Sequence, residues 1–176
     1  MKKIVLIYGL IAGAIVGGMM ITTMPMFEKG TLNFENGEVV GYTTMVIALS
    51  LVFFGVKSYR DNKLAGVITF GTAVKVGLLI TLVASLLYAL TWEVIYKEDF
   101  IQRYNEREVV KMKEEGATEA NLQAATKEME KFAEMYKNPI FRFGITLMEI
   151  LPVGIVISLL SAALLKKKDF LATTNT

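Results

Sequence analysis

Two residue types on which much of protein chemistry depends are missing: the 176 residues include no cysteine and no histidine. Without cysteine there is no disulfide, thiolate nucleophile, zinc ribbon or iron–sulfur cluster. Without histidine the chain lacks the commonest metal ligand and the usual general base near neutral pH. The remaining residues form no recognisable catalytic, cofactor-binding or metal-binding motif. We therefore expect no enzyme, no cofactor and no metal site.

A large charge of one sign is also missing, since the formal net charge is only +2. A charge this small gives no reason to expect a nucleic-acid partner. What the chain has in excess is apolar residues. Hydrophobic types make up 53% of it, whereas the apolar share of an average soluble domain is about 45–50% even with glycine counted. The arrangement of these residues decides the fold class.

The apolar residues gather in four runs, each close to the roughly 20 residues that a helix needs to cross a ~30 Å hydrocarbon core. The first run follows Lys2 and Lys3 and is too long for the apolar region of a signal peptide. Asn138 and Pro139 precede the last run, where asparagine caps a helix and proline fits its first turn. We predict an all-α, integral membrane four-helix bundle in a single domain, 1–176, with transmembrane helices at about 4–24, 39–56, 64–92 and 139–165.

Basic residues beside the runs indicate which side of the membrane the termini occupy. If the chain crosses four times, three basic clusters share one side, and such clusters in short segments stay in the cytoplasm. This pattern predicts that both termini are cytoplasmic. At the other end of the third run, Tyr88, Trp92 and Tyr96 have the position of interfacial aromatic anchors. The basic clusters are Lys2 and Lys3, then Lys57, Arg60 and Lys63, then Lys166, Lys167 and Lys168.

About 40 polar residues separate the third run from the fourth, which is too many for a simple connection. Gly116 is expected to end one helix, and Thr118 to cap a second helix. We predict an extracytoplasmic helical hairpin at about 97–137. Apolar residues at helical spacing form a stripe along the second helix, which packs within the protein, docks a partner helix or lies flat in the lipid interface. The stripe consists of Leu122, Met129, Phe132 and Tyr136.

Two charged residues lie inside apolar runs, Lys75 in the third and Glu149 in the fourth. Counted at about 1.5 Å per residue from opposite faces, both approach the middle of the membrane, where a lone charge costs at least about 2.5–3.5 kcal/mol. Opposite charges at matching depth on antiparallel runs predict an intramembrane ion pair. The pair either fixes the helix register or serves as a proton or ion relay.

Small residues form a face on two of the runs. Gly9, Gly13 and Gly17 recur at every fourth position of the first run, a spacing that lets two helix backbones approach closely. We expect the first and fourth runs to pack on each other, with a homodimer through the glycine face as the alternative. The small-residue face of the fourth run consists of Gly154, Ser158 and Ala162.

A family resemblance is carried by three segments: GYTTMVIALSLVFFGVKSYR, GVITFGTAVKVGLLITLVASLLYALTWEVIY and MEILPVGIVISLLSAALLKKK. With them the chain resembles the bacterial multi-pass membrane family catalogued as domain of unknown function 4199 (DUF4199), over nearly its whole length. The most specific pieces are FGVKSYR at 54–60, Trp92, and Pro152-Val153-Gly154 leading to Ser161-Ala162. The resemblance implies a protein of the bacterial cytoplasmic (inner) membrane. It brings no activity, ligand or catalytic residue.

The function that these features favour is a structural or interaction module that anchors an extracytoplasmic helix pair. The lipid bilayer surrounds it, and its expected partner is a second copy of the chain or another membrane protein. The alternative is a small transporter or an ion- or proton-conducting unit that uses Lys75 and Glu149.

Overall fold

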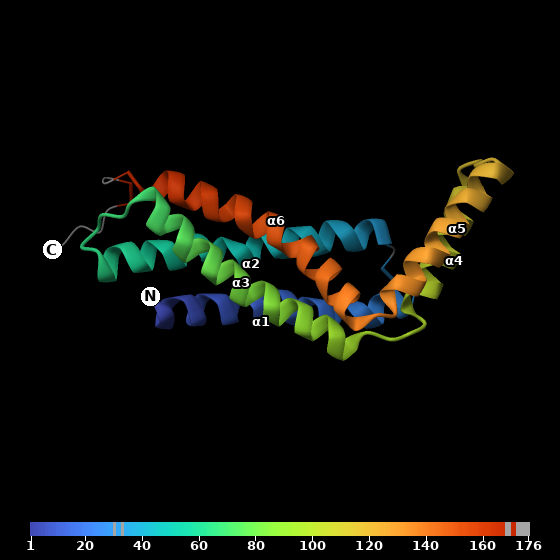
Figure 1. Ribbon diagram of the computed structural model, residues 1–176, viewed down its shortest axis with the longest axis horizontal. Helices are drawn as coiled ribbons and strands as arrows, with labels where there is room; N and C mark the ends of the chain where they lie inside the picture. Colours follow the sequence, from blue (N-terminus) through green and yellow to red (C-terminus); the bar gives the residue numbers. More distant parts are fainter. Residues whose placement is uncertain (30, 33, 168–169, 172–176) are drawn as a thin grey trace. The chain divides into compact units, whose positions relative to one another are not determined.

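The computed structural model describes residues 1–29, 31–32, 34–167 and 170–171, and every regular element within them is an α-helix. This confirms the predicted all-α class. The six helices, in chain order, are α1 (Lys2–Glu28), α2 (Phe34–Lys63), α3 (Phe70–Ile95), α4 (Phe100–Glu114), α5 (Glu119–Tyr136) and α6 (Pro139–Leu165) (Figure 1).

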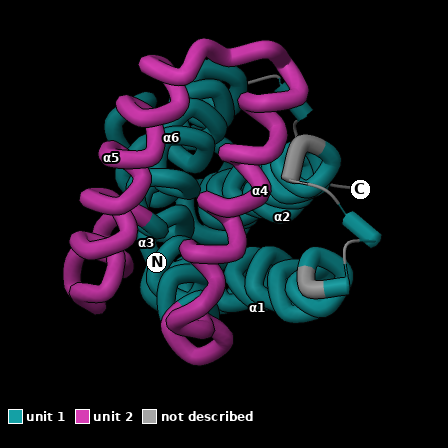
Figure 2. The backbone as a smooth tube through the Cα atoms, turned by 90° about the vertical axis from the view of Figure 1, so that its right-hand side faces the viewer, with its two compact units in different colours: residues 1–92, 146–176 teal, residues 93–145 magenta. Residues whose placement is uncertain are grey.

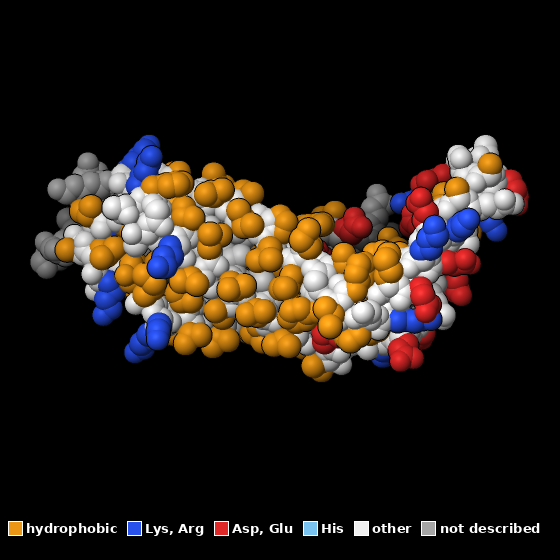
Figure 3. All heavy atoms as spheres, in the orientation of Figure 1, with side chains coloured by type: hydrophobic (Ala, Val, Ile, Leu, Met, Phe, Trp, Pro, Cys, Tyr) orange, Lys and Arg blue, Asp and Glu red, His pale blue; other side chains and the backbone are white. Residues whose placement is uncertain are grey.

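Four of the helices, α1, α2, α3 and α6, are long and apolar enough to cross a membrane, with 26 to 28 residues each in the apolar stretch. At about 1.5 Å per residue these helices reach roughly 39–42 Å, which exceeds a ~30 Å hydrocarbon core. Large apolar side chains stay exposed along all four of them (Figure 3). Such surfaces are stable in lipid and costly in water. The chain is a membrane protein with four candidate spans.

Two compact units divide the chain (Figure 2). Unit 1 comprises Met1–Trp92 and Thr146–Thr176, and it contains α1, α2 and the greater part of α3 and α6. Its core includes Val52, Ile80 and Ile150, which are completely buried. Unit 2 comprises Glu93–Ile145, with α4, α5, the end of α3 and the beginning of α6.

A tight turn connects α2 to α3, and the third span therefore starts at a later residue than predicted. The amides of Leu64 and Gly66 both donate to the carbonyl of Arg60 at 3.1 Å. Gly66 has a φ of +84°, which glycine adopts without strain at a helix end. α3 therefore begins at Phe70, six residues later than the apolar run suggested. α2 extends beyond the predicted 39–56 because polar residues on both sides of that run continue the helix.

Helix ends around unit 2 follow the expected capping residues. Gly116, with a φ of +81°, follows the end of α4. The amide of Asn121 donates to the Thr118 hydroxyl at 3.4 Å, and Asn138 Oδ1 accepts from the second residue of α6 at 2.9 Å. α4 and α5 pack against each other, and the Asn105 side chain donates to the carbonyl of Met129 at 3.3 Å. The predicted helix ends are confirmed because capping depends on neighbours in the chain.

Candidate functional site

Small residues bring α3 and α6 into close contact inside unit 1. A Cβ added to Gly77 would lie 2.9 Å from Ser158 Cβ, and a Cβ added to Gly154 would overlap the Thr81 side chain. The Thr81 hydroxyl lies 3.3 Å from both the Gly154 carbonyl and the Ser158 hydroxyl. Ser158 in turn donates to the Gly154 carbonyl at 2.7 Å. Thr81 and Ser158 are completely buried, so glycines and hydroxyls together hold these two spans.

Glu149 lies further along the same pair of helices. The hydroxyl of Tyr88, on α3, donates a hydrogen bond to Glu149 Oε2 at 3.2 Å. Tyr88 is buried, whereas Glu149 is exposed. The charged group that acts on Glu149 is Glu38 of α2, and their like charges repel. A carboxyl group from α6 and a phenol from α3 therefore form the candidate site, and the charge of a second carboxylate, from α2, acts on it.

The predicted ion pair between Lys75 and Glu149 is wrong. Facing residues of the antiparallel helices are Gly77 with Ser158, Thr81 with Gly154, and Tyr88 with Glu149. Continuing this pairing toward the start of α3 places Lys75 opposite Leu160. Leu160 is 11 residues, or about 16 Å along the helix, from Glu149. The prediction failed because it placed the start of the third helix at residue 64 instead of Phe70. Lys75 is exposed within the first turns of α3, where a lysine side chain can extend toward water.

Gly9, Gly13 and Gly17 of α1 pack against α3. An added Cβ would lie 2.6 Å from Val83 Cβ at Gly9, 2.9 Å from Leu87 Cβ at Gly13, and 2.8 Å from Thr91 Oγ1 at Gly17. The expected packing of the first span on the fourth through these faces is therefore wrong. Both small-residue faces meet α3, and the glycine face proposed for a homodimer is covered within the chain. A glycine face predicts that some helix comes close, and it does not predict which helix.

α3 is the central span of unit 1. α2 also contacts it through a glycine, since a Cβ on Gly55 would lie 2.5 Å from Ile80 Cδ1 and 3.1 Å from Tyr8 Cγ. Half of the most apolar 18 residues of α3 are buried, compared with a third or less in each of the other spans. Glycines of α1, α2 and α6 thus allow three helices to surround α3.

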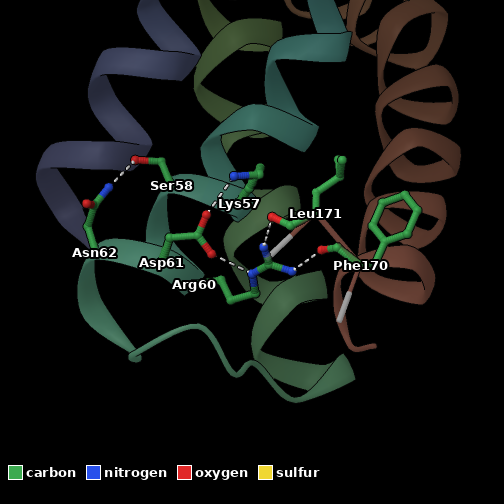
Figure 4. A network of polar contacts seen from close by, with 7 residues as sticks. All are labelled: Lys57, Ser58, Arg60, Asp61, Asn62, Phe170 and Leu171. Carbon is green, nitrogen blue, oxygen red and sulfur yellow. Dashed lines mark hydrogen bonds and ion pairs between the residues drawn. The ribbon is translucent and has the colours of Figure 1, made fainter. Parts of the chain in front are cut away.

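Arg60 is completely buried near the end of α2 and binds the segment that follows α6 (Figure 4). Its Nη1 and Nη2 donate to the carbonyls of Phe170 and Leu171 at 2.8 and 3.0 Å. Its Nε donates to Asp61 at 2.7 Å, and Lys57 donates to the other oxygen of Asp61. Hydrogen bonds to carbonyls and a carboxylate compensate for the burial of the guanidinium charge. From the sequence Arg60 was only one of the basic residues beside a span, and this contact was not predicted.

Unit 2 contains a second buried arginine, Arg142, in the first turn of α6. Its Nε and Nη2 donate to the two carboxylate oxygens of Glu93 at 2.9 and 2.5 Å. Its Nη1 donates to the Tyr136 carbonyl at 3.1 Å, and its Cζ lies 4.0 Å from the centroid of the Tyr96 ring. We call these four residues the Arg142 node. A two-pronged ion pair, a carbonyl and an aromatic face make this a strong attachment point.

The predicted docking stripe is used largely inside unit 2. Tyr136 is buried, and its ring centroid lies 5.6 Å from that of Tyr96 and 5.5 Å from that of Phe132. Phe132 also contacts Phe141, at 6.0 Å. The other stripe residues, Leu122 and Met129, are half-buried in α5. Packing within the protein therefore accounts for the stripe, and Tyr136 presents little surface to a partner.

The sequence does not predict the partners of Glu149 and Arg142. The position of Tyr88 predicts an interfacial aromatic anchor, whereas in the structure Tyr88 is the donor to Glu149. Glu93 was not singled out at all, although it pairs with Arg142. A usable signal existed for the second pair: the two residues have opposite charges and flank the segment that joins the third and fourth runs.

An exposed ion pair lies just before α6 and contributes little to this site. Lys137, just before α6, donates to Glu134 at 2.6 Å, and this hydrogen bond raises the pKa of the lysine above its usual value. The pair is exposed to solvent, so its effect on stability is small.

Within the described part of the chain, no group of three or more acidic side chains gathers to hold a metal ion.

Comparison with known proteins adds one match. The model of a family described as "Protein of unknown function (DUF4199)" matches residues 7–167. Searches of curated proteins and of solved structures returned no match.

Proposed function

The chain belongs to the DUF4199 family, and we propose that it is a structural or interaction module whose membrane spans anchor the α4–α5 helix pair. The proposed role is not catalytic. Its proposed location is the bacterial inner membrane, with both termini in the cytoplasm. In support, the beginning of α1 and the end of α6 lie at the same end of unit 1 (Figure 1), and Lys2, Lys3, Lys166 and Lys167 belong to these helix ends.

The Arg142 node is the observation that carries this proposal. It joins the end of α5 to Glu93 at the end of α3 and to the first turn of α6. Arg142 is only 8% exposed, so its bonds are screened little by solvent. A helix pair held at such a point can present its surface in one orientation, which recognition of a partner requires.

Apolar side chains remain exposed on the helix pair after its internal packing is complete. Met135 of α5 is 49% exposed, Val110 of α4 is 53% exposed and Phe132 is 37% exposed. Charged residues of both signs are their neighbours in the sequences of α4 and α5. Exposed apolar side chains among charged ones are typical of protein interfaces. We propose that another membrane protein binds there, with a second copy of the chain as the alternative partner.

Crosslinking in cells tests the proposal. A photoreactive residue at Met135 or Val110 is expected to capture the same membrane protein, and Phe132→Ala is expected to reduce the yield at least several-fold. A photoreactive residue at Lys127, on the polar surface of α5, is the matched control and is expected to capture little. Equal yields from all three positions, or no captured protein, would contradict the proposal.

The alternative, a small transporter or an ion- or proton-conducting unit, loses the Lys75–Glu149 pair on which it depended. One observation still favours it: Glu149 lies in the body of a membrane span, bonded to a buried tyrosine. Ionisable residues in such places often mark ion and proton paths.

A further inference from the structure

Glu149 occupies an exceptional place for a carboxyl group. It is the eleventh of the 27 residues of α6, whose only other charged residue is Arg142 in the first turn. An ionised side chain within a span is costly, and proteins usually offset the cost with a partner of opposite charge. The surroundings of Glu149 must therefore explain how its charge is tolerated.

No basic side chain of the described residues forms an ion pair with Glu149. Tyr88 from α3 donates a hydrogen bond to Oε2, and the charge of Glu38 from α2 repels an ionised Glu149. Lys75 lies about 16 Å away along the helices, and Arg142 is bound to Glu93. A second acid offers Glu149 no counter-charge and adds repulsion to its ionised form.

We infer that Glu149 is a proton-binding site, where the carboxyl group takes up and releases a proton beside Tyr88. In the ionised form Oε2 accepts the hydrogen bond of the Tyr88 hydroxyl, as observed at 3.2 Å. When a proton binds to the carboxylate, the new O–H group can donate to the Tyr88 oxygen instead, and the tyrosine keeps its own proton. The same two oxygens thus remain hydrogen-bonded in both forms.

Buried hydroxyl groups continue from Tyr88 along α3. Ser85 and Thr81 follow at successive turns on the same helix face, and both are completely buried. Ser85 Oγ has no hydrogen-bond partner within the described structure, which is rare for a buried hydroxyl. Beyond it, the Thr81 and Ser158 hydroxyls lie 3.3 Å apart. Glu149 therefore lies at one end of a row of groups that can accept and donate protons.

This inference goes beyond the anchoring function and does not depend on it, because the crosslinking surface lies on α4 and α5. Either proposal can fail while the other stands.

Infrared difference spectroscopy of the full-length protein in phosphatidylcholine vesicles tests the inference, with spectra recorded between about pH 4 and about pH 9. The wild type is expected to gain the band of a protonated carboxyl group in an apolar environment as the pH falls, and Glu149→Gln is expected to lose that band. Tyr88→Phe is expected to shift both the band and its midpoint. The control Glu134→Gln removes an exposed carboxyl group and is expected to leave the band unchanged.

Identical pH difference spectra for the wild type and Glu149→Gln would overturn the inference, since the carboxyl group would then keep one form throughout the range. A band unaffected by Tyr88→Phe would overturn the assigned role of the tyrosine. Should Glu149→Gln not fold, Glu149→Asp retains a titrating carboxyl group. The protonated-carboxyl band of Glu149→Asp is then expected to differ in frequency from that of the wild type. An unchanged frequency would exclude residue 149 as the source of the band.

Discussion

Three charged side chains of the long helices are compensated in different ways. Arg60 binds two backbone carbonyls and Asp61, and Arg142 binds both oxygens of Glu93. Among the described residues, the hydrogen-bond partner of Glu149 is the hydroxyl of Tyr88. The two arginines are always charged, so their compensation must be complete in the folded state. A carboxyl group can become neutral, which is why one donor is enough at Glu149.

The Arg142 node predicts a large difference between two single glutamate substitutions. Glu93→Gln leaves Arg142 buried without its counter-charge, and we expect it to lower the free energy of unfolding by about 3 kcal/mol. Glu134→Gln breaks the exposed pair with Lys137, and we expect a loss of about 1 kcal/mol or less. Thermal unfolding in mild detergent, followed by circular dichroism, measures both. Equal losses would show that the node contributes no more than a surface ion pair.

Among the elements, α3 determines how the membrane spans fit together. α1, α2 and α6 each approach it through glycine, at Gly9, Gly55 and Gly154 for example. Between lipid-exposed helices there is little hydrophobic driving force, so close backbone contact supplies much of the attraction. A side chain added at one of these contacts should separate the helices, and a side chain added elsewhere on the same helix should not.

Gly9→Ala and Gly18→Ala test this difference within α1. A Cβ at residue 9 would lie 2.6 Å from Val83 Cβ and 3.0 Å from the Ile80 carbonyl, whereas nothing lies within 4 Å of a Cβ at residue 18. We expect Gly9→Ala to destabilise by about 1–3 kcal/mol through overpacking. Gly18→Ala should be neutral or stabilise by up to about 1 kcal/mol through helix propensity. Denaturation in detergent measures both, and a neutral Gly9→Ala would argue against the α1–α3 contact.

At the scale of the whole molecule, the proposed topology follows from an even number of spans. If all four candidate spans cross the membrane, the chain before α1 and the turn between α2 and α3 lie on one side, and the segment between α3 and α6 lies on the other. Lysine and arginine gather at the end of unit 1 where α1 begins (Figure 3). By the positive-inside rule, we propose that this side faces the cytoplasm.

Labelling of single cysteines tests this orientation, and the natural chain is a suitable background because it has none. Asn62 near the end of α2 and Gln123 in α5 are both exposed. With a membrane-impermeant maleimide, Gln123→Cys should react in intact cells, and Asn62→Cys only after permeabilisation. The reverse pattern would show an inverted protein, and reaction of both in intact cells would contradict four spans.

The site was predicted less well than the spans, and the reason lies in one helix start. The apolar run begins at Leu64, but the carbonyl of Arg60 accepts two amides in a turn that includes Gly66. α3 consequently starts at Phe70. Six residues correspond to about 9 Å along a helix, so the predicted depth of Lys75 was wrong by that amount and its pairing with Glu149 failed.

The sequence by itself determined the features that depend on neighbouring residues: four apolar spans, the end of α4 at Gly116, and the caps at Thr118 and Asn138. Hydropathy and capping act within a few residues, so they can be read directly. Only the tertiary structure decided that the glycines of the other spans pack against α3, that Tyr88 binds Glu149 and that Glu93 binds Arg142. Those contacts depend on the register between helices distant in sequence, where a shift of a few residues exchanges one partner for another.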